Sequence, residues 1–347
     1  DQADNMRPTV HDIAAEAGVS LATVDRVMNA RPGVREKTKV KVEQAIEKLG
    51  YVRDVAAANL AKGRTYPFTF ILPCNENAFM GELRDAVLQA NERGRIERTQ
   101  ITIVDVPAFD AEALAEALVA TGESNPAGIA VVAIQADPVR EAVRKLTDRG
   151  IPVVTLVSDL EDSTRDHYAG VDNPAAGRTA ATLLGRFLSR QKGTIGVLAG
   201  SLSVRDHQNR FSGFSEIMAA HFPELSILPP MEGRDDSALA RKLVCEAVEA
   251  HPDMIGLYSL GAGNRGLIAA LEEARTKGRE LVTIAHELSA HSREALETGL
   301  FDVVLNQDAG HEVRSAIRVL KAKADGLEVI AAQERIRIDI FIKDNLP

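Results

Sequence analysis

The sequence has few aromatic residues, few cysteines and no long apolar run. None of its 347 residues is tryptophan, and aromatic residues make up 4% of the chain. The two cysteines, Cys74 and Cys245, are far apart and outside metal-ligand spacing, which favours buried thiols over a disulfide framework. The apolar runs are too short to cross a bilayer, and no signal-peptide pattern opens the sequence. We therefore expect a cytoplasmic protein that makes no contact with a membrane.

The sequence also lacks an overall positive charge, which argues against a general nucleic-acid binder. The formal net charge is −9, but it is unevenly distributed. Residues 1–66 hold 11 Lys and Arg against 9 Asp and Glu, whereas the remaining residues hold 30 against 41. Because phosphates repel the acidic remainder, this distribution favours contact between DNA and the N-terminal part alone.

The N-terminal part contains three predicted helices joined by short turns. The first begins after Thr9, at a capping-box spacing, and ends at Gly18. Ser20 is the predicted N-cap of a second helix, Leu21–Met28, and a third helix runs from about Glu36 to Leu49. So short a connection between the first two helices forces them to cross steeply, as in a helix-turn-helix. The second helix would then fit the major groove of DNA.

Apolar residues at helical spacing predict a small core for these helices. The expected core residues are Val10, Ile13, Val24, Val27, Val42, Ala45, Ile46 and Leu49. A small helical bundle with no role in DNA binding is the alternative interpretation.

A longer motif runs through the same segment. It consists of Thr9-Val10-His11-Asp12-Ile13-Ala14, Gly18-Val19-Ser20, Thr23-Val24-x-Arg26-Val27-x-Asn29, Val34-x-x-Lys37-Thr38, Leu49-Gly50-Tyr51 and Ala57-x-x-Leu60-Ala61. With this motif the chain resembles the headpiece of the lactose-repressor (LacI/GalR) family of bacterial transcription regulators. The resemblance implies a homodimer, or a tetramer, on a pseudo-palindromic operator, with a sugar-like effector in a second domain. We expect a repressor and leave open whether the effector weakens or strengthens DNA binding.

Side chains of the second helix are expected to reach base edges in the major groove. The predicted DNA-binding residues are Thr9, Ser20, Leu21, Ala22, Thr23, Asp25, Arg26, Asn29, Arg35, Thr38, Tyr51, Ala57 and Leu60. Arg26 suits a bidentate contact to guanine, and the hydroxyl and cationic groups suit phosphates. Asp25 stands where the resembled family usually carries a small residue. It either accepts a hydrogen bond from cytosine or holds Arg26.

Residues 51–66 form the predicted hinge between the two domains. The alanine-rich segment around Ala57 is a helix too short to be stable alone. The resemblance implies that two copies pair on DNA and insert Leu60 into the minor groove. Arg53-Asp54 replaces the Pro-Asn common before this helix, which leaves the start of the helix open. A plain alanine linker is the alternative.

From residue 67 onward, predicted strands and helices alternate, which is typical of parallel α/β sheets. We predict an all-α helix-turn-helix domain at residues 7–50, followed by a periplasmic-binding-protein-like effector-binding and dimerisation domain at 67–347. The second domain should consist of two doubly wound parallel-sheet lobes. Lobe 1 is expected at about 67–172 plus 306–333, and lobe 2 at about 173–305 plus 334–347. Ile336–Ile342 is the last predicted strand.

Ligands of such sheets bind at the carboxyl ends of the strands, so the residues just after each predicted strand are candidates. The predicted effector-binding residues are Asn77, Phe79, Gln135, Ser158, Asp159, His207, Arg210, Asn264, Glu287 and Gln307. Carboxylates, amides and an arginine can grip the adjacent hydroxyls of a sugar, a polyol or a sugar phosphate. The resemblance places Arg210 and Glu287 at the family's effector-binding arginine and sugar-gripping acid.

One motif favours a different function. Gly261-Ala262-Gly263-Asn264-Arg265-Gly266 matches the dinucleotide-binding pattern GxGxxG and follows a predicted strand. It keeps open a nucleotide-dependent oxidoreductase as the alternative. The motif lies late in the chain, and the sequence has neither a metal-binding histidine spacing nor a nucleophile elbow. We therefore predict a regulator that is not an enzyme and uses no cofactor and no metal.

Overall fold

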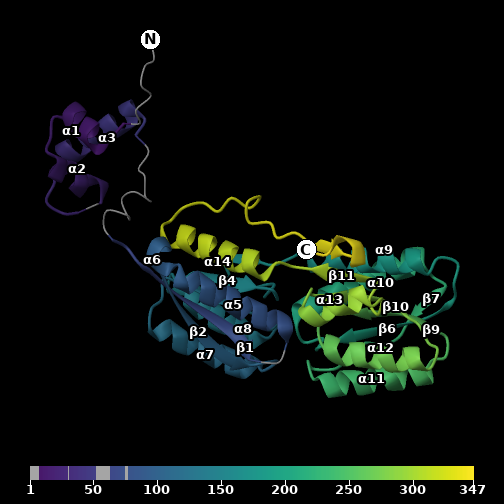
Figure 1. Ribbon diagram of the computed structural model, residues 1–347. Helices are drawn as coiled ribbons and strands as arrows, with labels where there is room; N and C mark the ends of the chain where they lie inside the picture. The colour runs from purple at the N-terminus through teal and green to yellow at the C-terminus, as the bar shows by residue number, and fades with distance from the viewer. Residues whose placement is uncertain (1–7, 30, 52–62, 75–76) are drawn as a thin grey trace, which may run out of the picture. The chain divides into compact units, whose positions relative to one another are not determined.

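The computed structural model describes residues 8–29, 31–51, 63–74 and 77–347. The chain divides into two compact units at Arg64–Thr65, whose elements are labelled in Figure 1. The predicted hinge helix, with Ala57 and Leu60, lies outside the described residues.

The first unit contains α1 (Val10–Ala17), α2 (Leu21–Met28) and α3 (Glu36–Leu49). The Thr9 hydroxyl accepts a hydrogen bond from the backbone N–H of Asp12, whose carboxylate accepts one from the backbone N–H of Thr9, a capping box. Gly18 ends α1 in the left-handed conformation, with φ 64°, and the Ser20 hydroxyl caps α2. These local signals confirm the predicted helix-turn-helix.

The core of this unit differs from the prediction at one residue. Ile13, Val24 and Val42 are buried, and Ala45 packs with them. Val10 is 38% exposed, so its expected place in the core is wrong. It is the first residue of α1, whose buried residues are Ile13, Ala14 and Ala17.

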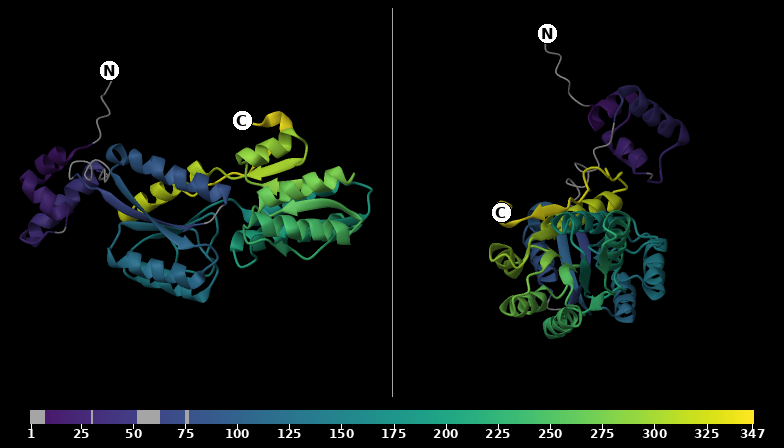
Figure 2. Two further views of the ribbon diagram at one scale, coloured as in Figure 1. Left: turned by 60° about the horizontal axis from the view of Figure 1, so that its bottom comes forward. Right: turned by 90° about the vertical axis from the view of Figure 1, so that its right-hand side faces the viewer.

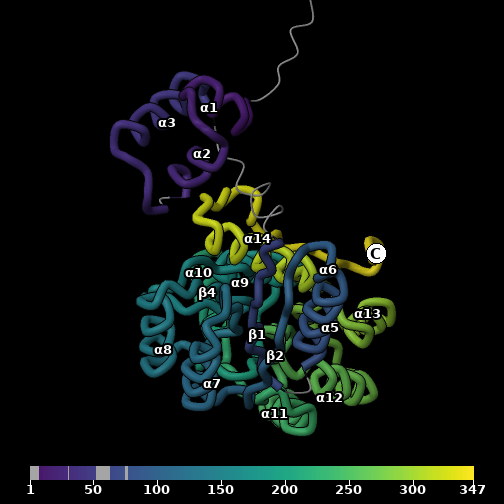
Figure 3. Tube along the Cα trace, turned by 90° about the vertical axis from the view of Figure 1, so that its left-hand side faces the viewer, coloured from purple at the N-terminus to yellow at the C-terminus, as the bar shows by residue number. Residues whose placement is uncertain are grey.

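The second unit begins with a parallel sheet covered by helices on both faces, here called lobe 1. Its elements are β1 (Tyr66–Cys74), α5 (Ala78–Glu92), α6 (Gly94–Glu97), β2 (Thr99–Pro107), α7 (Ala111–Glu123), β3 (Gly128–Val131), α8 (Asp137–Asp148), β4 (Val153–Leu156), β5 (His167–Ala169) and, from later in the chain, α14 (Ala309–Ala324). The strand order is β2-β1-β3-β4-β5, with parallel pairing throughout this order. Helices α7 and α8 cover one face, and α5 and α14 cover the other (Figure 3).

Lobe 2 holds the remaining elements. They are α9 (Asn173–Phe187), β6 (Gly193–Ala199), α10 (Arg205–His221), β7 (Leu225–Ile227), β8 (Met231–Glu232), α11 (Ser237–Ala250), β9 (Met254–Ser259), α12 (Asn264–Thr276), β10 (Val282–His286), α13 (Ala290–Glu297), β11 (Val303–Asn306), β12 (Asp339–Phe341) and the 3-10 helix η1 (Lys343–Asn345). The strand order is β12-β11-β10-β9-β6-β7, and β8 pairs with the end of β6. Helices α9 and α10 pack on one face of this sheet, and α11, α12 and α13 pack on the other.

The predicted α/β fold with parallel sheets is therefore confirmed, with two corrections. The last strand is confined to Asp339–Phe341 and runs antiparallel to β11, because the chain enters it on returning from lobe 1. The thiol of Cys74 is exposed and that of Cys245 is half-buried, so the expectation of two buried thiols is wrong for Cys74.

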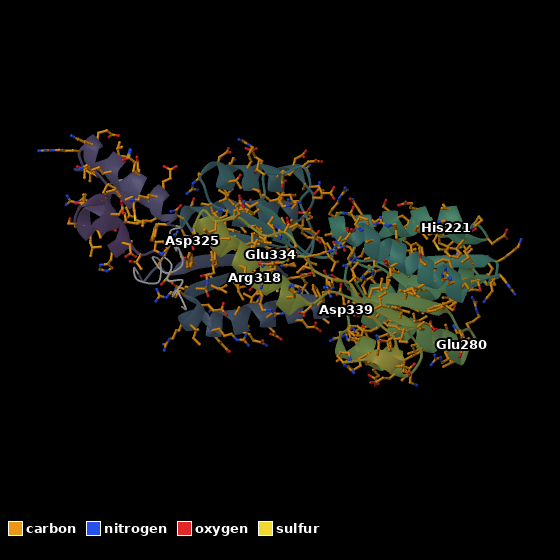
Figure 4. The ribbon with its side chains drawn as sticks, turned by 90° about the horizontal axis from the view of Figure 1, so that it is seen from above. His221, Glu280, Arg318, Asp325, Glu334 and Asp339 are labelled. Atoms are coloured by element: carbon orange, nitrogen blue, oxygen red, sulfur yellow. The ribbon has the colours of Figure 1, made fainter. Side chains whose placement is uncertain are left out.

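The two lobes are joined by segments that are far apart in the sequence (Figure 2). The chain leaves lobe 1 after β5, returns between β11 and α14, and crosses again between α14 and β12. Before the last crossing, the Glu334 carboxylate accepts hydrogen bonds of 2.8 and 3.0 Å from Arg318 on α14. In Figure 4 these two residues lie together beside α14, whereas Asp339 lies in lobe 2. The bidentate ion pair thus holds the returning chain on lobe 1.

Candidate functional site

The exposed face of α2 is the first candidate site. Val24 packs into the headpiece core with 1% exposure, so the opposite side of the helix faces solvent. Leu21 is 43% exposed, and Ala22 and Arg26 are also exposed. The structure thus brings these predicted base-reading residues to one accessible helix face.

The Asp25 carboxylate does not hold Arg26, which corrects one of the two predicted roles for Asp25. It accepts a hydrogen bond of 2.7 Å from the Asn29 amide and forms an ion pair of 3.2 Å with Arg31. Arg26 instead extends toward the turn after α2, where a Cβ atom added at Gly33 would lie 3.8 Å from its Nη1. Asp25 therefore joins the end of α2 to the following turn.

The predicted phosphate-contacting residues surround this helix face. Thr9, Ser20 and Thr23 already make local hydrogen bonds at helix starts, with 3.0 Å between the Ser20 and Thr23 hydroxyls. Arg35 is the N-cap residue of α3, and Thr38 lies in the first turn of that helix. The ring of Tyr51 packs against the headpiece core.

The second candidate site is a cleft between the two lobes, where the carboxyl ends of strands from both sheets meet. Its volume, including the open mouth, is about 670 Å³. The lining residues are Pro73, Asn77, Phe79, Met80, Val106, Pro107, Ala108, Phe109, Leu114, Val132, Ala133, Ile134, Val157 and Ser158 from lobe 1, and Val204, Asp206, His207, Arg210, Asp235, Gly261 and Glu287 from lobe 2.

Arg210 on α10 is the cation of this cleft and is 1% exposed. Its Nε donates to the Asn173 side chain at 2.8 Å, and its Nη1 donates to the Leu260 carbonyl at 2.7 Å. The Nη1 atom also lies 3.5 Å from the Glu287 carboxylate. Nη2 is buried and has no partner among the described residues. Because buried polar groups are nearly always hydrogen-bonded, this atom is available to a ligand.

Close packing of α9 against α10 places the arginine. A Cβ atom at Gly177 would lie 1.9 Å from the Arg210 carbonyl oxygen, and one at Gly213 would lie 2.2 Å from the Pro174 carbonyl oxygen. Only glycine permits this approach of the two backbones. The next residue, Phe214, stacks on Tyr258 with the ring centroids 4.5 Å apart.

Glu287 faces Arg210 from the loop after β10. Burial raises the pKa of its carboxyl to about 7, although Arg210 and a 2.9 Å hydrogen bond from Gln307 oppose the rise. Its Oε2 has no partner among the described residues. Glu312 on α14 is fully buried, and its pKa is raised well above the ordinary value, first by burial and then by Glu287. Burial therefore favours the protonated form of Glu312.

Three further polar residues of lobe 2 line the cleft. The His207 Nδ1 accepts a hydrogen bond of 3.2 Å from the backbone N–H of Gly200, and its Nε2 lies 3.8 Å from the Asp206 carboxylate. The Asp235 carboxylate accepts a hydrogen bond of 3.2 Å from Asn77 of lobe 1, and burial raises its pKa. Contacts across the cleft also include an Arg205–Glu161 ion pair.

Four residues that line the cleft have a strained backbone. Phe109, Val157, Asp235 and Glu287 have φ values of 60°, 62°, 59° and 72°, in the left-handed region that favours glycine. For the β-branched Val157 this conformation is unusually costly. Such strain is most often retained where it serves a function, which supports the cleft as a site.

The structure brings six of the ten predicted effector residues to the cleft. These are Asn77, Phe79, Ser158, His207, Arg210 and Glu287. Asn264 lines an adjoining recess, and Gln307 lies behind Glu287.

Gln135 and Asp159 do not line the cleft, and this is the main departure from the predicted site. The Gln135 amide donates to the Glu161 carbonyl at 3.4 Å. The Asp159 carboxylate pairs with Arg165 and accepts a hydrogen bond of 2.7 Å from Thr155. Burial alone would raise the pKa of Asp159, but these hydrogen bonds outweigh it and lower the pKa.

Asp235 and, apart from Phe79, the apolar wall were missed by the sequence reasoning. Asp235 follows the two-residue strand β8, which is too short to give a periodic signal. The apolar lining residues carry the same pattern as core residues of the strands and helices around them.

The glycines of the 261–266 motif have structural roles. Gly261 and Gly263 have φ values of 118° and 76°, and Gly263 is the N-cap residue of α12. A Cβ atom at Gly266 would lie 2.2 Å from the Ser237 carbonyl oxygen, so this glycine permits close packing of α11 and α12. The Asn264 amide fills the turn by donating to the His286 carbonyl at 2.8 Å. A backbone turn and helix packing therefore account for the motif.

The described part of the chain holds neither a metal-binding cluster nor a membrane-spanning helix. No group of three or more His, Cys, Asp and Glu side chains is arranged to hold a metal ion there. No helix among the described residues has the length and apolarity needed to cross a membrane.

Comparison with known proteins gives two family matches. Residues 9–54 match the bacterial regulatory proteins of the lacI family, and residues 68–328 match the periplasmic binding protein domain.

The chain is also similar to individual regulators and binding proteins. It is 32% identical over 277 residues to the HTH-type transcriptional regulator MalR of Streptomyces coelicolor, covering 75% of this chain and 76% of that protein. It is 44% identical over 78 residues to catabolite control protein A of Priestia megaterium, and this match covers 22% of this chain and 24% of that protein. The glucose-galactose binding protein GanP of Geobacillus stearothermophilus superposes with a TM-score of 0.73 at 19% identity, covering 82% of this chain and 99% of that one.

Proposed function

Because this chain belongs to the lacI family of bacterial regulatory proteins, we propose that it is a repressor whose affinity for operator DNA is changed by a small molecule in the interlobe cleft. The DNA is a pseudo-palindrome, and the ligand is a sugar or a polyol. No catalytic step and no cofactor enter this proposal. Since it acts on bacterial operators, the protein works in the cytoplasm.

One observation carries the effector part of the proposal. Buried polar atoms without partners among the described residues converge on the cleft from both lobes. They are Nη2 of Arg210 and Oε2 of Glu287 from lobe 2, and the Ser158 hydroxyl from lobe 1. Leaving such a group unpaired costs roughly 1–3 kcal/mol. A ligand with hydroxyl groups that satisfies them therefore gains affinity from contacts with both lobes.

The DNA-binding part rests on the exposed face of α2. In this proposal Arg26 contacts guanine, Leu21 and Ala22 make apolar contacts with base edges, and the hydroxyls at the helix starts contact phosphates. Residues 7–50 form the DNA-binding domain, residues 51–66 the hinge and residues 67–347 the effector-binding domain. Leu60 of the hinge enters the minor groove when two hinges pair.

Self-association is part of the same proposal, since a pseudo-palindrome is matched by a two-fold dimer. Large apolar side chains on the second unit are exposed. They include Leu88, Ile96, Val119, Phe187, Leu327, Ile330, Ile340 and Ile342. Exposed apolar groups of this kind mark association surfaces when they gather in patches. We propose a homodimer as the DNA-binding form.

Effector and DNA are coupled by a population shift. The ligand binds best when both lobes contact it, and therefore favours the closed arrangement of the lobes. A change of lobe orientation at the hinge then alters the pairing of two hinge segments. The coupling free energy for such systems is typically about 1–3 kcal/mol, or about 5–150-fold in operator affinity.

The experiment that tests the proposal begins with selection of an operator from random duplex DNA by the full chain. Binding to the selected operator is then measured at several salt concentrations, with and without sugars and polyols that raise the melting temperature of the protein. The proposal predicts salt-dependent, sequence-specific binding that a stabilising ligand changes. Failure to select any sequence would reject the DNA-binding function.

A further inference from the structure

The two walls of the cleft differ in chemistry. Of the described residues that lobe 1 contributes to the lining, only Asn77 and Ser158 have polar side chains. The Asn77 amide is engaged with the Met80 backbone N–H, the Asp235 carboxylate and the Gly261 carbonyl. The rest of this wall is hydrocarbon or aromatic, and it includes the buried side chains of Leu114 and Ile134.

The wall of lobe 2 is polar and rich in acceptors. Asp206, Asp235 and Glu287 supply carboxyl groups, against one guanidinium group from Arg210. Among the described lining residues of this wall, the buried atoms without a partner are one acceptor, Oε2 of Glu287, and one donor, Nη2 of Arg210. This wall therefore suits the hydroxyl groups of a ligand, which donate as well as accept.

An ordinary hexose does not match this asymmetry, because it carries hydroxyl groups around its whole ring. With one edge against lobe 2, its remaining hydroxyls would face the hydrocarbon wall of lobe 1. Burying a hydroxyl without a partner is costly, whereas burying an apolar group there is favourable. A phosphorylated sugar fits less well still, since its charge would meet three carboxyl groups and an arginine already paired with Glu287.

We propose that the effector is a conjugate with two different ends: a hydroxyl-bearing ring bound by lobe 2 and an uncharged apolar group bound by lobe 1. Glycosides with an aromatic or alkyl aglycone are the class that has this structure. The inference rests on the proposed function, because it names the ligand class of the proposed effector site. It differs from that proposal in requiring the apolar end for tight binding.

The test compares matched probes on the full-length protein. Glucose, galactose, mannose and xylose are each measured beside both anomers of their phenyl glycosides, together with glucose 6-phosphate, by thermal shift and calorimetry. At least one phenyl glycoside should bind at least tenfold more tightly than its parent sugar, which corresponds to about 1.4 kcal/mol. Glucose 6-phosphate should give no shift.

Two variants of one residue of the lobe 1 wall test whether this wall causes the preference for the phenyl glycoside. Ile134 lies in the loop after β3 and is 9% exposed in the cleft. Ile134→Thr places a hydroxyl group in the wall and should reduce the preference for the phenyl glycoside at least threefold. Ile134→Val keeps the wall apolar and should retain the preference. Both melting temperatures without ligand are compared with the wild type, so that a loss of fold is not mistaken for a loss of binding.

Three outcomes overturn the inference. The first is a free sugar or glucose 6-phosphate that binds as tightly as any phenyl glycoside. The second is a preference for the phenyl glycoside that Ile134→Thr leaves unchanged. The third is a melting temperature that no probe raises at a concentration of about 10 mM, which is high enough to detect weak ligands. The proposed function is tested separately by operator binding. If a free sugar changes operator affinity, the function stands and this inference fails. If a phenyl glycoside binds without changing operator affinity, the inference stands and the function fails.

Discussion

Replacing Glu287 by glutamine should change how the stability of the second unit depends on pH. Burial raises the pKa of this carboxyl to about 7, from an ordinary value of 4.5. Between these two pH values the folded protein holds a proton that the unfolded chain has lost. The free energy of unfolding should therefore fall as the pH rises through this window.

The expected change in the free energy of unfolding follows from the shift in the pKa of Glu287. Each unit of pKa difference corresponds to about 1.4 kcal/mol, so Glu287 alone should remove about 3 kcal/mol of stability between pH 4.5 and pH 7. Glu312, whose pKa is also raised by burial, changes stability in the same direction. The part of this rise that comes from burial is present in both proteins, whereas the part that comes from Glu287 is lost in the variant and enlarges the expected difference. The variant Glu287→Gln keeps the shape of the side chain and cannot ionise.

The assay is urea unfolding followed by circular dichroism at pH 5, 6, 7 and 8, for the wild type and for Glu287→Gln. The fall in unfolding free energy from pH 5 to pH 8 should be smaller in the variant by about 2–3 kcal/mol. Glu297→Gln on the exposed side of α13 is the matched control and should keep the wild-type pH dependence. If the free energy of unfolding depended on pH equally in all three proteins, the raised pKa of Glu287 in the cleft would be refuted.

The remaining predictions concern DNA binding, the cleft and helix packing. Arg26→Ala should weaken binding to a selected operator about 5–150-fold, the value of one bidentate base contact, with the melting temperature unchanged; unaltered affinity in a gel shift would remove Arg26 from the base-reading surface. Arg210→Lys removes the planar donor group and should weaken any cleft ligand at least about tenfold in calorimetry, while ligand-free operator binding stays intact. Arg241→Lys, on the exposed side of α11 and outside the cleft lining, is the control, and equal losses in the two variants would contradict the assignment. Gly177→Ala should destabilise the protein by about 1–3 kcal/mol, because its Cβ would lie 1.9 Å from a backbone oxygen of α10. Gly81→Ala, with open space around the added Cβ in α5, should be neutral or stabilising by up to about 1 kcal/mol in the same urea assay, and the opposite order would show that the packing of α9 on α10 is misjudged.

The headpiece was predictable because its signals are local. Thr9, Gly18 and Ser20 specify helix ends through contacts within three or four residues, and the structure has the helices at the predicted positions. The partner of Asp25 was not predictable in the same way. Both Arg26 and Arg31 are close enough along the chain to pair with this carboxylate. The ion pair forms with Arg31 because of the conformation of the chain after α2, which the sequence does not show.

The cleft was predictable in outline and not in detail. The strand-end rule identifies Ser158 after β4 and Glu287 after β10, because the parallel strands of each sheet end at one edge and both edges line the cleft. The same rule fails for Asp159, because it takes no account of side-chain partners. Arg165 and Thr155 bind this carboxylate away from the cleft. Apart from Phe79, the apolar wall of lobe 1 left no signal, because a residue such as Leu114 has the same sequence pattern in a core and beside a cleft.

The most direct test of the account is the dissociation constant of the selected operator, measured with and without a saturating ligand that stabilises the protein through the cleft. The account predicts a change of at least about fivefold for the wild-type protein and no change for Arg210→Lys at the same ligand concentration. An operator dissociation constant that is identical with and without the bound ligand in the wild-type protein would contradict it.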